Sequence, residues 1–120
     1  MLRRLVLLLL LAMSAGACDS ETPVTPTPAP PNSTTVTIRV GASTLGTNAY
    51  VPSPMTVAVG TLVSFVNNDS TAHTTVADAG AWTSPNIAPG NRFNVTLTTA
   101  GIYPYHCSLH AGMVGTLTVQ

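Results

Sequence analysis

From residue 34 onward, apolar and polar residues alternate along the chain with a period of two. In the first such segment Val36, Ile38 and Val40 alternate with threonine and arginine residues, and a second segment begins at Met55. This alternation is typical of strands that turn one face toward a core. Further strands are predicted at residues 61–67, 72–77, 93–98, 101–106 and 114–119. No stretch has a helical period of useful length, so we predict an all-β sandwich of about seven to eight strands.

The first 33 residues lack this alternation. Residues 1–17 contain two arginines and an apolar run about half as long as a membrane-spanning helix requires, which predicts an export signal peptide. Residues 18–33 are rich in threonine and proline, and we predict that they form an extended tether. Residues 34–120 then form the one folded domain. We expect an exported protein, on the periplasmic or cell-surface side of a membrane.

Cys18 ends the run Ala15-Gly16-Ala17-Cys18. This run resembles a bacterial lipobox, in which the cysteine becomes the acylated first residue of the mature protein. The resemblance implies a lipid anchor at Cys18 that holds the domain to a membrane. The alternative is ordinary cleavage and a soluble secreted protein, because small residues also suit a general signal peptidase.

Charged residues are scarce and balanced. The chain has four arginines and lysines together against four acidic residues, and none of the four cations is a lysine. Binding nucleic acid requires a stripe of basic side chains, which this composition cannot build, so we exclude a nucleic-acid partner. Low charge also leaves little for electrostatic steering, and we expect partners to dock mainly through apolar contact.

The segment from Cys107 to Met113 carries the candidate chemistry. A thiol, the imidazole of His110 and a thioether lie within it, and soft sulfur donors with imidazole select copper. His73 follows a turn elsewhere in the chain, and a sandwich can bring the two loops together at one end. Taken singly, His73 reads as a hydrogen-bonded loop histidine, Met113 as a core methionine and Cys107 as a small buried apolar residue.

Other uses of these residues fit less well. His106 has the opposite strand parity to Cys107, so we expect it to face away from the metal. Trp82 and Asp78 are interpreted as packing and turn residues. Structural zinc prefers four cysteine or histidine ligands, and a c-type haem requires Cys-x-x-Cys-His. A cysteine nucleophile would need a base and an orienting third group, and nothing in the sequence supplies the third.

The domain resembles the cupredoxins, the blue-copper family that includes plastocyanin, pseudoazurin, azurin and amicyanin. Residues 50–68 are similar to the paired strands before the family's first ligand, and Cys-x-x-His-x-x-Met matches the short ligand loop of amicyanin. The resemblance implies a Greek-key sandwich that binds one copper per chain. Its implied ligands are the ring nitrogens of His73 and His110, the thiolate of Cys107 and, as a long axial ligand, Met113. Thr74 stands where family members often have an asparagine or serine that ties the ligand loops together, and its hydroxyl can serve in the same place.

The same resemblance implies a carrier of single electrons and not an enzyme. The exposed edge of His110 would be the electron port, where a redox protein partner docks. The apolar ring expected around that edge consists of Leu109, Ala111, Gly112 and Pro89. We expect a monomer. Two alternatives stay open: a copper-binding module that stores or delivers the metal without redox cycling, and a tethered adhesion or structural domain whose site stays empty.

Overall fold

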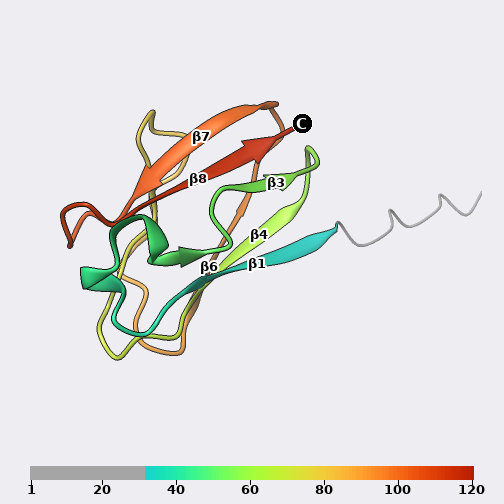
Figure 1. Ribbon diagram of the computed structural model, residues 1–120. Coiled ribbons are helices and arrows are strands. Elements are labelled where there is room, and N and C mark those ends of the chain that lie inside the picture. The colour runs from blue at the N-terminus through green and yellow to red at the C-terminus, as the bar shows by residue number, and fades with distance from the viewer. Residues whose placement is uncertain (1–31) are drawn as a thin grey trace, which may run out of the picture.

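The structure is a computed structural model that describes residues 32–120. The predicted signal peptide, Cys18 and nearly all of the tether lie outside the described residues. The described part forms two four-stranded sheets packed face to face (Figure 1). The first sheet has the order β2-β1-β4-β6 and the second the order β3-β8-β7-β5. The strands are β1 (Ser33–Ile38), β2 (Tyr50–Val51), β3 (Met55–Val57), β4 (Leu62–Asn67), β5 (Val76–Ala77), β6 (Arg92–Thr96), β7 (Gly101–His106) and β8 (Val114–Val119).

The chain passes repeatedly from one sheet to the other, which gives the predicted Greek-key sandwich. Strands β1 and β4 run parallel, as do β3 and β8, and the remaining pairs are antiparallel. Two short 3-10 turns, η1 (Ala42–Thr44) and η2 (Gly46–Asn48), are the helical elements of the described range. None of its helices is long and apolar enough to cross a membrane.

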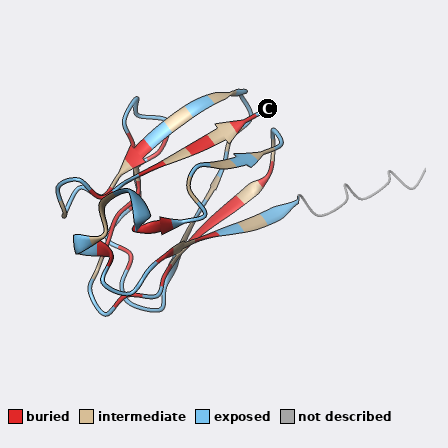
Figure 2. Ribbon diagram, viewed as in Figure 1, coloured by how far each residue is buried: buried red, intermediate tan, exposed pale blue. Residues whose placement is uncertain are grey.

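The inward faces of the two sheets meet in an apolar core (Figure 2). Tyr105 lies at its centre: its ring makes edge contacts with the rings of Tyr50 at 4.9 Å and Phe65 at 5.2 Å between centroids. Such edge-to-face pairs add about 0.5–1.5 kcal/mol beyond the burial of their area. Trp82 is also buried and contacts the same aromatic cluster, which confirms its interpretation as a packing residue.

Several strands differ in extent from the predicted ones. Strand β1 ends at Ile38, and Val40, which the alternation assigned to the same strand, is 75% exposed in the turn that follows. Strand β3 likewise ends at Val57 and leaves Val59 exposed. The alternation did not predict strand β2, because two residues are too short to show a period of two.

The segment predicted as a strand at 72–77 enters the sheet only at Val76–Ala77. The residues before it remain extended but pair with the connection that leads to β6. His73 and Ile87 exchange backbone hydrogen bonds, and the amide of Ser84 donates to the carbonyl of Thr75. A period of two reveals an extended backbone, but it does not reveal which neighbour takes its hydrogen bonds.

Gly115 lies directly opposite Tyr105 across the β7–β8 ladder. The tyrosine ring covers the glycine so closely that an added Cβ would overlap ring atoms. The position therefore requires a residue without a side chain.

We expect Gly115→Ala to lower the free energy of unfolding of the metal-free chain by about 1–3 kcal/mol, because the new methyl group must displace a buried aromatic ring. Gly101→Ala is the matched control in the same ladder, since its Cβ would meet Tyr103 at an ordinary 3.5 Å. Urea denaturation of both variants measures the difference. Equal losses in the two variants would contradict this account of the core.

Candidate metal centre

The pairing of β5 with β7 brings the two candidate loops together. Val76 lies opposite His106 and Ala77 opposite Tyr105, so the residues that precede β5 run alongside those that follow β7. His73 is on the first segment and Cys107 on the second. The meeting of loops that the sequence suggested is thus a consequence of sheet register.

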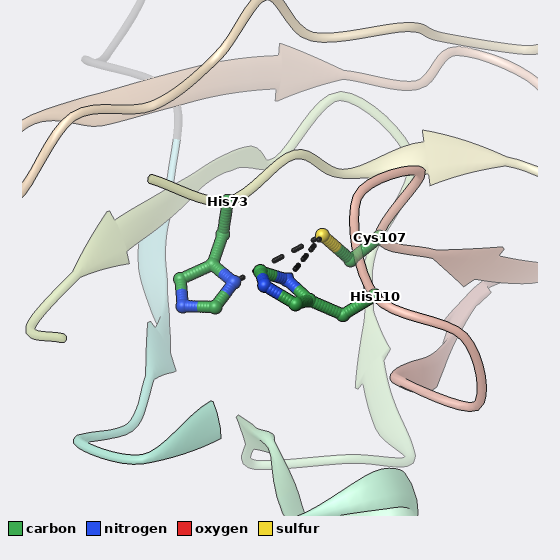
Figure 3. Close-up of side chains that lie close together, drawn as sticks. All are labelled: His73, Cys107 and His110. Atoms are coloured by element: carbon green, nitrogen blue, oxygen red, sulfur yellow. Dashed lines mark hydrogen bonds between the residues drawn. The ribbon is translucent and has the colours of Figure 1, made fainter. Parts of the chain in front are cut away.

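Three of the predicted site residues form a cluster at this end of the sandwich (Figure 3). Cys107 Sγ lies 3.9 Å from Nδ1 of His73 and 3.5 Å from Nδ1 of His110. One donor atom from each residue lies within 4.8 Å of the other two, and the two imidazole centroids are 4.8 Å apart. His73 and Cys107 are buried, whereas His110 is partly exposed.

Met113 is the last residue of the loop that begins at Cys107, and its side chain is fully buried. The amide of Cys107 donates to the carbonyl of Met113, and the amide of Met113 donates to that of His110. These two bonds fold the loop back on itself. Three of the four predicted ligands therefore sit on one short segment of fixed shape.

Thr74 joins the two loops through its side chain. Its hydroxyl oxygen accepts a hydrogen bond from the Ser108 amide at 2.7 Å and lies 2.9 Å from the Ser108 hydroxyl. Its own amide faces Cys107 Sγ at 3.4 Å, and its hydroxyl faces the same sulfur at 3.7 Å. Thr74 can thus donate to the sulfur from two groups and takes over the bridging that asparagine or serine would supply.

Asp69, in the turn that precedes His73, is a site residue that the sequence analysis did not identify. Its Oδ2 lies 2.8 Å from Nε2 of His73, on the ring edge opposite Cys107. Backbone donation from Gly41, and next the contact with His73, hold the pKa of the Asp69 carboxyl well below its usual range. The four-residue spacing of Asp69 and His73 was the available signal, but that spacing alone does not distinguish a contact from two separate loop positions.

His106 points away from the cluster, as its strand parity predicted. Its Nδ1 lies 2.6 Å from Oδ1 of Asp78, and both side chains are about half exposed. Asp78 follows β5 in a turn, as expected, and in addition pairs with this histidine.

The donor set fits copper. A cysteine sulfur and two imidazole nitrogens are close enough to share one ion, and a buried methionine closes the same loop. Cysteine and methionine sulfur select soft metals, and two histidines with one cysteine and a weak methionine are the ligands of blue-copper centres. Fold and site together define a cupredoxin-type copper centre.

A family model described as copper binding proteins of the plastocyanin/azurin family matches residues 36–120. The chain therefore belongs to the plastocyanin/azurin family of copper-binding proteins, and the metal of its centre is copper. It is 38% identical over 97 residues to chloroplastic plastocyanin of Chlamydomonas reinhardtii, covering 70% of this chain and 66% of that protein. It is 36% identical over 99 residues to plastocyanin of Prochlorothrix hollandica, covering 73% and 75%.

Solved structures agree with this assignment. A purple cupredoxin from Nitrosopumilus maritimus superposes with a TM-score of 0.66 at 30% identity, covering 72% of this chain and 98% of that chain. An amicyanin mutant in the Cu(I) state gives 0.63 at 25% identity, covering 73% and 82%. A copper-containing nitrite reductase from Thermus scotoductus gives 0.65 at 30% identity, covering 77% of this chain but only 23% of that one. The predicted family and fold class are confirmed.

We expect Thr74→Val to lower the free energy of unfolding of the metal-free chain by about 1 kcal/mol. Valine keeps the shape of the side chain but cannot accept the hydrogen bond from the Ser108 amide. Ser108→Ala is the matched control, since it removes the Ser108 hydroxyl but keeps the hydrogen bond from the Ser108 amide to the Thr74 hydroxyl. Chemical denaturation compares the two. A Thr74→Val variant as stable as the parent would show that the two loops are held together by other contacts.

Proposed function

We propose that this chain carries single electrons between redox proteins, using one copper ion that alternates between Cu(I) and Cu(II). The proposed ligands are His73, Cys107, His110 and Met113. The observation that carries the proposal is the position of the Cys107 sulfur, which faces one nitrogen of each imidazole at 3.9 and 3.5 Å. In this assignment Cys107 would bind copper as thiolate, both histidines would bind through Nδ1, the ring nitrogen that faces the sulfur, and Met113 would supply a weak thioether ligand.

The surroundings of the donors support repeated electron transfer. His73 is held by backbone bonds to Ile87, and the Cys107–Met113 loop is closed by its own hydrogen bonds. Thr74 fastens one segment to the other. Ligands fixed in this way change position little when the charge of the metal changes, which favours fast exchange of an electron.

His110 is the proposed electron port. It is the partly exposed imidazole of the cluster, whereas His73 has no exposed surface. Leu109 beside it is 48% exposed, and Ala111, Gly112 and Pro89 are exposed as well. With so few charges in the chain, a redox partner would dock here through apolar contact, and we propose that the carrier acts as a monomer.

A carrier is favoured over an enzyme. The proposed copper ligands are buried, apart from the partly exposed His110, and a substrate would need an open coordination position. The match to the nitrite reductase covers 23% of that chain, so its activity is not transferred to this protein. Storage or delivery of copper without redox cycling is the alternative that an experiment must separate.

Adding Cu(II) to the full chain is expected to produce an intense blue absorption that a reductant bleaches and an oxidant restores, because a Cu(II)–thiolate bond forms at Cys107. Cys107→Ser should abolish the band, since serine supplies no thiolate. Cys18→Ser is the matched control: it removes the other cysteine of the chain and should leave the spectrum unchanged. Visible absorption and electron paramagnetic resonance measure both.

The outcomes separate the alternatives. A colourless complex of similar affinity would favour storage or delivery and reject the carrier. A blue band that survives Cys107→Ser would reject the ligand assignment.

We also propose that the protein is exported and held to a membrane by a lipid on Cys18. The support is the sequence of residues 1–33, with its apolar run, lipobox-like end and proline-rich tether. In a bacterial host we expect the parent chain to partition into the detergent phase of a phase-separating surfactant, and Cys18→Ser to move to the aqueous phase. Mass spectrometry of the mature N-terminus should find acyl groups. An unmodified N-terminus would indicate a soluble secreted protein instead.

A further inference from the structure

Asp69 is buried against the copper centre and fully engaged by hydrogen bonds. Its side chain is 6% exposed, and that of His73 is 0% exposed. Oδ1 accepts from the amides of Gly41 at 3.0 Å and Ser70 at 2.8 Å, and Oδ2 faces Nε2 of His73 at 2.8 Å. The Thr71 hydroxyl also reaches Oδ2, at 3.3 Å. The carboxylate is therefore fixed by two segments of the chain and cannot turn away from the histidine.

This contact determines which nitrogen of His73 carries the hydrogen. A carboxylate only accepts hydrogen bonds, so the ring must present an N–H at Nε2. The lone pair of the neutral ring is then on Nδ1, the nitrogen that faces the Cys107 sulfur. The ring is thus prepared for metal binding before any metal arrives.

We infer that Asp69 is a positioning residue of the copper centre, which holds His73 as the Nε2–H tautomer and lowers the reduction potential of the bound copper. The inference rests on the proposed function, because it concerns the same centre. Asp69 touches neither the sulfur nor the proposed electron port in the contacts described above. It acts through His73.

The direction of the effect on the potential follows from charge. A carboxylate that accepts from a ligand imidazole makes the imidazole a stronger donor, and a negative charge in a buried site is screened little by water. Both effects stabilise Cu(II), which carries one more positive charge, relative to Cu(I). Removing the charge should therefore raise the reduction potential.

The chain contains its own control pair. Asp78 and His106 form a carboxylate–imidazole contact of 2.6 Å, but both side chains are about half exposed and the ring points away from the cluster. Water screens the Asp78–His106 pair, and neither of the two side chains contacts a proposed ligand in the structure. A substitution at Asp78 removes the same chemical group without changing the surroundings of His73.

The test compares Asp69→Asn with Asp78→Asn in the copper-loaded full chain by protein-film voltammetry. In the first variant the Gly41 and Ser70 amides should retain the asparagine oxygen, leaving its NH₂ against His73. We expect the ratio of Cu(II) to Cu(I) affinity to fall about tenfold, which raises the potential by about 59 mV for one electron. Asp78→Asn should leave the reduction potential unchanged. An equal potential in both variants, or a lower one in Asp69→Asn, would overturn the inference.

A second measurement uses the metal-free protein. Long-range ¹H–¹⁵N correlation of the histidine rings should identify His73 of the parent as the Nε2–H tautomer, and Asp69→Asn should move the hydrogen to Nδ1. A parent His73 with its hydrogen on Nδ1 would overturn the inference even if the variant does not fold. Absence of a blue band in the copper-loaded parent would instead reject the carrier, while the metal-free spectra still decide the role of Asp69.

Discussion

The metal centre depends on two residue pairs of a very short strand. Val76 opposite His106 and Ala77 opposite Tyr105 set the position of the His73 segment along β7. Because side chains alternate across a strand, a slip of one residue would turn His73 away from Cys107. Four other contacts reinforce this register: the His73–Ile87 bridge, the hydrogen bonds between Thr75 and Ser84, the Thr74–Ser108 bond and the Tyr50 hydroxyl bond to the Thr74 carbonyl.

The site end of the sandwich is a buried polar layer set on an apolar core. Its members are Asn67, Asp69, His73, Thr74, Thr75 and Ser84. Each has a hydrogen-bonding partner: Asn67, for example, donates to the carbonyls of Thr71 and Ile87 and accepts from the amide of Asp69. Burying such groups without hydrogen-bond partners would cost more than the small net stability of a domain allows. Complete hydrogen bonding of this layer is therefore a condition for holding the metal-binding atoms at defined positions. The hydrogen bonds that pair the buried polar groups of these loops thus also orient the side chains proposed as copper ligands.

The sequence was sufficient to predict the sandwich and most of its strands, because alternation is a local pattern. The Cys107–Met113 spacing, together with the family resemblance, led to the four residues proposed as ligands. The sequence had limits as well. It did not reveal β2, which is too short for a period, or the pairing of the His73 segment with residues 83–87 instead of a sheet. Asp69 was missed for a related reason. Its role depends on a turn that aims its carboxylate at a ring four residues later and on a donor, Gly41, from a distant part of the chain. Local patterns predict which residues are available, whereas long-range hydrogen bonds determine which of them act together.

Trp82 lies where the aromatic core meets this polar layer. Its indole N–H donates to the hydroxyl of Thr75, two residues after His73, while its ring packs against Phe65 and Tyr105. It is the single tryptophan of the chain. Its fluorescence is therefore an intrinsic optical reporter from one known point in the interior, close to the segment that carries the first histidine and free of overlapping emission from other indoles.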